Sequence, residues 1–130
     1  MKTTWDNFWK EKGKSMEWSQ EDVLYSDGMN ELAEKILTSL NKKSLKEVSL
    51  LELGAGMGIT SLYFGSKGAK VSLLDYSNEA KPLAKEYWGS HAKHTFIVAD
   101  LFTFKPKERY DMVTSFGLCE HFIDKQRREV

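Results

Sequence analysis

The sequence contains little cysteine, little proline and no long apolar run. Its 130 residues include one cysteine, Cys119, and two prolines, Pro82 and Pro106. A single cysteine excludes an internal disulfide and a cysteine-based metal cluster, so no metal site is expected. No apolar stretch is long enough to span a membrane, and the opening residues lack the apolar run of a signal peptide. These absences favour a cytoplasmic enzyme or binding domain.

The chain also lacks net charge. Its 19 basic and 19 acidic residues give a formal charge of zero, so no overall field favours nucleic acid or an anionic membrane as a partner. Hydrophobic residues make up 41% and charged residues 29% of the chain, which is typical of a globular protein. The length is that of one domain at most.

What the sequence does contain is a regular alternation of short apolar runs and amphipathic segments. The apolar runs predict strands over residues 48–53, 70–75, 95–99 and 110–115. Between and around them, helices are predicted over 27–43, 58–66, 77–88 and 118–130, with Asp27 and Ser77 as caps. Residues 101–109 read as a loop or a distorted helix. This order predicts an α/β fold, a Rossmann-like doubly wound and mostly parallel sheet with helices on both faces.

The two ends of the chain differ from this pattern. Residues 1–26 form a lead-in in which Trp5, Phe8 and Trp9 fall at helical spacing. These aromatics either pack on the outside of the domain or belong to a lid that closes over a ligand. Residues 27–130 form the binding domain, and we expect it to be truncated after the fourth strand. That strand would be an edge, which a second copy or a partner chain could cover.

Three glycines follow the first predicted strand at alternate positions, Gly54, Gly56 and Gly58. Glycine tolerates positive φ and lets the backbone approach a ligand closely. In the dinucleotide fingerprint G-x-G-x-x-G the third glycine would stand at position 59, where this chain has Ile59. A dinucleotide is therefore disfavoured, and a nicotinamide-binding fragment is a weaker alternative.

Three carboxylates lie at the ends of the predicted strands: Glu52, Asp75 and Asp100. In parallel sheets ligands bind at the carboxyl ends of the strands, where the winding reverses. A carboxylate at the end of the second strand, such as Asp75, suits the two hydroxyls of a ribose. Each acid could instead be a strand-end residue or a helix cap.

Together these stretches resemble a known family. The segments E-L-G-A-G-M-G, L-L-D-Y-S, V-A-D-L-F and Y-D-M-V-T-S-F-G-L-C-E-H-F are similar to those of class I S-adenosylmethionine-dependent methyltransferases, in the same order. Among these enzymes the chain is most similar to the small-molecule group related to quinone biosynthesis. The resemblance covers residues 27–130. It implies S-adenosyl-L-methionine as the cofactor and a Rossmann-like fold.

The resemblance also implies roles for the glycine loop. Gly54, Ala55 and Gly56 would lie against the methionine part of the cofactor, with Gly58 in the same loop. Glu52 would orient the amino group of the cofactor, directly or through water.

The adenosine end of the cofactor would meet the second and third strands. By resemblance, Asp75 would bind the ribose hydroxyls and Tyr76 would flank the adenine. Asp100 would accept from the adenine amino group and Leu101 would cover the ring. Ser115, with the two residues after it, would lie beside the sulfonium and the acceptor.

The function expected from this resemblance is methyl transfer to a small molecule. The chain lacks N-P-P-Y after the fourth strand and a Pro-Cys pair, which disfavours adenine, glutamine and cytosine as acceptors. No catalytic residue is assigned, because the reaction needs mainly positioning. Glu120 and His121 are either a catalytic or a surface pair, and Cys119 reads as a small buried hydrophobe. The alternative function is a non-catalytic fragment that binds the cofactor or a partner.

Overall fold

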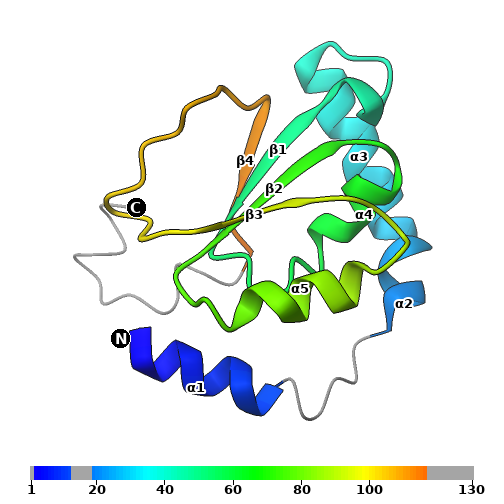
Figure 1. The fold of residues 1–130 in the computed structure, drawn as a ribbon. Coiled ribbons are helices and arrows are strands. Elements are labelled where there is room, and N and C mark those ends of the chain that lie inside the picture. Colours follow the sequence, from blue (N-terminus) through cyan, green and yellow to red (C-terminus); the bar gives the residue numbers. More distant parts are fainter. Residues whose placement is uncertain (1, 13–18, 117–130) are drawn as a thin grey trace.

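The computed structural model describes residues 2–12 and 19–116 and contains one parallel sheet (Figure 1). Its strand order is β3-β2-β1-β4, from β1 (Ser49–Leu53), β2 (Lys70–Asp75), β3 (Thr95–Val98) and β4 (Met112–Thr114). The predicted parallel, Rossmann-like sheet is confirmed, with β1, β3 and β4 each shorter than expected. Because β2 and β3 lie on one side of β1 and β4 on the other, the winding reverses between β1 and β4.

Five α-helices and one 3₁₀ helix accompany this sheet in the part of the chain that the structure describes. The described elements are α1 (Lys2–Lys12), α2 (Gln20–Leu24), α3 (Asp27–Leu40), the short 3₁₀ helix η1 (Leu45–Glu47), α4 (Ser61–Ser66) and α5 (Ala80–Trp88). The amphipathic helix expected in the lead-in is thus present as α1. Within the described ranges, no helix combines the length and the apolar character needed to cross a membrane.

The core lies between one face of the sheet and the helices. Alternate strand residues, Leu50 on β1 with Val71 and Leu73 on β2, share a buried cluster with Phe64 of α4 and Trp88 of α5. Both crossovers, β1 to β2 and β2 to β3, step in the same direction across the sheet. Right-handed crossovers therefore place α4 and α5 on the same face.

The expectation of helices on both faces is not met within the described residues. The connection 99–111 from β3 to β4 forms turns without a helix, and in Figure 1 it runs on the other side of the sheet from α3 and α4. Pro106 lies in this connection, and a proline removes a backbone donor that a helix would use. The helix predicted over 118–130 lies outside the described residues.

Two of the predicted helix caps are wrong, although α3 begins at Asp27 as predicted. The cap of α3 is Ser26 and not Asp27, because the Ser26 Oγ accepts from the Met29 N–H at 3.2 Å while Asp27 is already helical. The prediction of an ending near Asn41 is confirmed, since this residue takes the left-handed conformation with φ 54°. Either serine or aspartate can cap a helix, so residue type alone did not separate the neighbours.

The helix expected from Ser77 begins instead at Ala80. The Ser77 Oγ accepts from the Glu79 N–H at 3.2 Å, which closes a turn between β2 and the helix. Serine hydroxyls make such local turns as readily as they cap helices. Pro82 falls in the first turn of α5, as expected.

Asp111 fixes the opposite, amino end of the sheet. Its Oδ2 accepts from the Ser49 N–H at 2.8 Å, and its own N–H donates to the Ser49 Oγ at 3.0 Å. The Ser49 N–H bond is the main cause that lowers the pKa of Asp111 below its usual value. The side chain therefore joins β1 to the start of β4, far from the carboxyl edge of the sheet.

A steric prediction follows from Gly65 in α4. A Cβ on this residue would lie 2.5 Å from Cζ3 of the fully buried Trp88, so Gly65→Ala should destabilise the fold by about 1–3 kcal/mol. Gly28 in α3 is the matched control, because its nearest neighbour would be 3.7 Å away, and Gly28→Ala should stabilise by roughly 0.4–1 kcal/mol. Urea unfolding measures both, and a Gly65→Ala midpoint at or above that of the wild type would contradict the packing.

Candidate functional site

The glycine loop follows the carboxyl end of β1, and its three glycines adopt the left-handed backbone conformation. Gly54, Gly56 and Gly58 have φ values of 64°, 56° and 68°, a region that residues with a Cβ rarely adopt. The loop is supported from below by α5, because the Trp88 Nε1–H donates to the Met57 carbonyl at 3.0 Å. Its backbone is therefore rigidly placed against the core.

Glu52 lies directly beneath this loop and is only 3% exposed. Its Oε1 accepts from the Ser61 Oγ, at the start of α4, at 2.5 Å. Burial raises the pKa of Glu52 from 4.5 to about 7; the Ser61 hydrogen bond lowers it, and the neighbouring Asp75 carboxylate raises it. Glu52 is thus a buried acid that can change its charge near neutral pH.

Asp75 joins the glycine loop to the turn after β2. Its Oδ2 accepts from the Gly56 N–H at 2.8 Å and its Oδ1 from the Ser77 N–H at 2.9 Å. Burial raises the pKa of Asp75, backbone N–H bonds from Ser77, Gly56 and Tyr76 lower it, and the Asp6 carboxylate raises it. Each oxygen keeps a second lone pair with which it can accept from a ligand.

The other predicted residues lie around Glu52, the glycine loop and Asp75, and fewer contacts join them to these groups. Ala55 is buried, and Tyr76, the residue after Asp75, is 37% exposed. The end of β3 is tied to the same edge, since the Ala99 N–H donates to the Asp75 carbonyl at 3.0 Å. Asp100 and Leu101 follow there, partly buried, with the Asp100 Oδ1 accepting from the Phe102 N–H at 2.9 Å.

Beyond β4 the connection to the site is weakest. Ser115 is exposed after the strand, and among the described residues its side chain makes no hydrogen bond to Glu52 or Asp75. Cys119, Glu120 and His121 lie outside the described residues. The structure therefore brings together Glu52, the glycine loop and Asp75, while Asp100 and Leu101 flank them.

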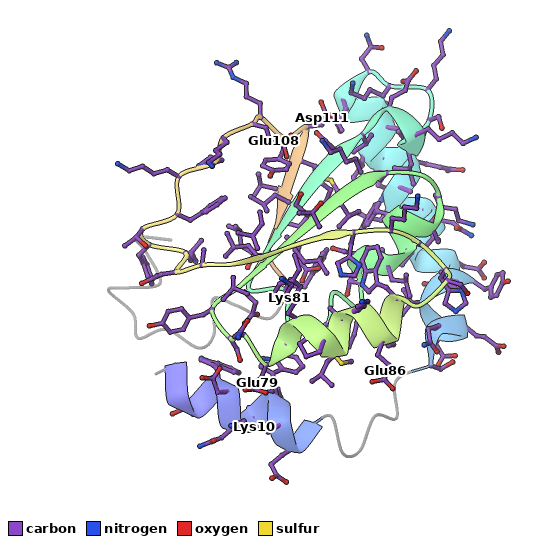
Figure 2. The ribbon with its side chains drawn as sticks, viewed as in Figure 1. Lys10, Glu79, Lys81, Glu86, Glu108 and Asp111 are labelled. Carbon is purple, nitrogen blue, oxygen red and sulfur yellow. The ribbon has the colours of Figure 1, made fainter. Side chains whose placement is uncertain are left out.

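Three residues of α1 lie at the site. Of these, Trp9 was expected only as outer packing or as part of a lid, and Asp6 and Lys10 were not predicted. Asp6 accepts through Oδ1 from the Ser77 Oγ at 2.5 Å, and Lys10 Nζ lies 3.9 Å from Glu79 Oε1 (Figure 2). Trp9 contacts the loop itself, since a Cβ on Gly56 would be 2.3 Å from its Cζ2. The helical spacing of residues 6, 9 and 10 could have placed them on one face of a helix. This spacing does not indicate where the helix docks.

Chemically, the site offers carboxylate oxygens and close backbone to a ligand. Such a set binds hydroxyl and ammonium groups, whereas no lysine follows the loop to hold a phosphate. In the part of the chain that the structure describes, no group of three or more His, Cys, Asp or Glu could hold a metal ion.

Most of the chain matches a known protein family. The family described as a methyltransferase domain matches residues 18–128. The chain belongs to this family. The match spans the sheet and its glycine loop, and it confirms the predicted family membership of this methyltransferase domain.

Curated relatives of the methyltransferase domain are longer proteins. It is 34% identical over 87 residues to malonyl-acyl carrier protein O-methyltransferase 1 of Ilyobacter polytropus, covering 65% of this chain and 32% of the relative. It is 29% identical over 83 residues to the ubiquinone biosynthesis O-methyltransferase of Nitrosomonas europaea, covering 62% and 35%. The chain therefore spans about one third of the length of these relatives.

Solved structures share the fold of this methyltransferase domain. A magnesium protoporphyrin IX methyltransferase from Synechocystis PCC 6803 superposes with a TM-score of 0.63 at 19% identity, over 97% of this chain and 66% of that one. An amino pentose methyltransferase from Micromonospora echinaspora gives 0.63 at 17% identity, over 92% and 46%. At these identities the likeness establishes the fold alone.

The raised pKa of Glu52 predicts how stability depends on pH. Folding raises this pKa from 4.5 to about 7, so the folded state keeps a proton that the unfolded chain releases in this window. The contribution of Glu52 is full below the unfolded pKa and is lost as the pH rises through about 7.

Glu52→Gln cannot lose a proton, so its stability relative to the wild type should increase by on the order of 3 kcal/mol from about pH 4 to about pH 8. Urea unfolding at several pH values measures this difference. Glu86→Gln, at an exposed position of α5, is the control and should follow the wild type. A Glu52→Gln curve parallel to the wild type would show that Glu52 does not titrate in this window.

Proposed function

We propose that this domain binds S-adenosyl-L-methionine at the carboxyl ends of β1 and β2 and transfers its methyl group to a small-molecule acceptor. The observation that carries the proposal is the bond from the Gly56 N–H to the buried Asp75 carboxylate, at 2.8 Å. It joins a close-approach glycine loop to an acid suited to a ribose. The loop follows β1, the strand at which the winding of the sheet reverses.

The residues present fit the methionine end of this cofactor. Gly54, Ala55, Gly56 and Gly58 form a loop whose glycines all have positive φ, so a ligand can approach the backbone closely. Glu52 lies below the loop and can hold the amino group of the ligand, directly or through water. As a carboxylate it would form charge-assisted hydrogen bonds there, each contributing about 1.5–3 kcal/mol.

The adenosine end fits the neighbouring strand ends. The Asp75 oxygens, which already accept backbone N–H groups, have lone pairs left that can accept the two ribose hydroxyls. The exposed ring of Tyr76 would flank the adenine, Asp100 would accept from its amino group, and Leu101 would cover the ring.

S-adenosylmethionine supplies a methyl group on a positively charged sulfur that is already activated for transfer. The domain therefore needs to hold donor and acceptor in line, and no residue is assigned to proton transfer. Ser115 follows β4 on the other side of the switch point from β2, which suits a position near the acceptor.

For the acceptor we propose an oxygen atom of a small molecule. The support is that two relatives, at 34% and 29% identity, are both named as O-methyltransferases. A non-catalytic cofactor-binding or partner-binding role is the second candidate. It is supported by β4, which pairs only with β1 among the described strands and could be covered by a second copy or another chain.

Equilibrium titration with S-adenosylhomocysteine tests the cofactor site. The wild type should bind saturably, and Asp75→Ala should bind at least about tenfold more weakly, because it loses charge-assisted hydrogen bonds to the ribose. Gly56→Val should bind weakly for a different reason, since its φ of 56° and the 2.3 Å approach of Trp9 leave no room for a side chain.

Asp111→Ala is the matched control, because it removes a carboxylate that also accepts a backbone N–H, at the opposite end of the sheet. It should bind like the wild type. A folded wild type that fails to bind S-adenosylhomocysteine but binds NADH would overturn the proposal in favour of a nicotinamide site. Saturable binding without methyl transfer to any hydroxyl compound would favour the non-catalytic role.

A further inference from the structure

Helix α1 docks on the carboxyl edge of the sheet through one face. Residues Asp6, Trp9 and Lys10, spaced three and four apart, contact Ser77, the glycine loop and Glu79 respectively. In Figure 1 the helix lies alongside α5, apart from the sheet that forms the core. An 11-residue helix is marginal in water by itself, so these contacts hold it in place.

The contact of Trp9 differs in kind from the other two. A Cβ on Gly56 would be 2.3 Å from Cζ2 and 2.4 Å from Cη2 of the indole. Atoms that close to a Cβ position are in direct van der Waals contact with the glycine backbone. No layer of ligand atoms fits between the indole and Gly56.

The same glycine surface is the one that the proposed function gives to the methionine part of the cofactor. The indole and such a ligand therefore exclude one another. Trp9 is partly buried and packs against the main core cluster, so it contributes an apolar contact that holds the helix in its docked position. The adjacent ring of Phe8, at 4.9 Å between centroids, remains 45% exposed.

The docked position also carries an electrostatic cost. Asp6 accepts from the Ser77 Oγ, and Ser77 in turn donates its N–H to Asp75, so two carboxylates share one turn. Their repulsion contributes to the raised pKa of Asp75. The Lys10–Glu79 pair, with side chains 57% and 42% exposed, offsets little of this.

We infer that α1 is an autoinhibitory lid whose Trp9 indole occupies the glycine cradle and must leave before the cofactor can bind. The inference rests on the proposed function, which supplies the ligand that competes with the indole. Only molecules in which the helix has undocked can bind, so the apparent dissociation constant equals the intrinsic constant divided by the undocked fraction.

Calorimetric titration with S-adenosylhomocysteine tests the inference. Trp9→Ala removes the plug and should bind more tightly than the wild type, within the range of about 5- to 150-fold typical of coupled sites. Trp9→Leu keeps an apolar side chain on the core but is too short to fill the cradle, and it should also bind more tightly. Asn7→Ala, an exposed position of the same helix, is the control and should match the wild type.

Hydrogen exchange of the α1 amides gives an independent readout. The ligand should accelerate exchange in the wild type, because it displaces a helix that is marginal alone. Slower exchange, or Trp9 variants that bind as weakly as the wild type or more weakly, would show that Trp9 is a wall of the site and overturn the inference. If neither the wild type nor the folded variants bind, the proposed function fails together with it.

Discussion

The Asp75 carboxylate is the contact on which the arrangement of the carboxyl edge depends. It accepts one N–H from the loop after β1 and one from the turn after its own strand, at 2.8 and 2.9 Å. Asp75 is 8% exposed, so little water would replace its carboxylate, and its loss would leave the two N–H donors unpaired at about 1–3 kcal/mol each. The same bonds orient Ser77 toward Asp6, so the place where α1 docks is set by the acid at the end of β2.

The glycine loop is fixed from the core side by a second constraint. A Cβ on Gly58 would lie 2.5 Å from Leu73 Cδ1 and 3.0 Å from Trp88 Nε1, and the same indole N–H donates to the Met57 carbonyl. Trp88 thus packs under α4 and the loop at once. Because the core beneath it is close-packed, the loop cannot yield inward, and anything that meets Gly56 must do so from the side of α1.

The sequence predicted the parts of the fold that depend on local pattern. Short apolar runs bounded by turns located β1 and β2 within one residue, because both are buried on two faces. The caps at Asp27 and Ser77 failed because serine and aspartate both satisfy free N–H groups, and only the folded backbone decides which does. In the site, Glu52, Gly56 and Asp75 came from spacing along strands, whereas Trp9 reaches Gly56 across 47 positions through a docking that no local pattern encodes.

The placement of three acids near one loop bears on what can occupy it. The Asp75 carboxylate lies close enough to Glu52 to raise the pKa of Glu52. The Asp6 carboxylate raises the pKa of Asp75 in the same way. When α1 is docked, Asp6 adds a third carboxylate beside Glu52 and Asp75. The apolar contact of Trp9 and the hydrogen bond from Ser77 to Asp6 offset the repulsion that this carboxylate brings. A ligand that brings a positive charge to the loop would relieve the repulsion between Glu52 and Asp75 that the docked helix leaves in place. The proposed cofactor, with a sulfonium and an ammonium group, has that character, so the acids favour its binding while the docked helix opposes it.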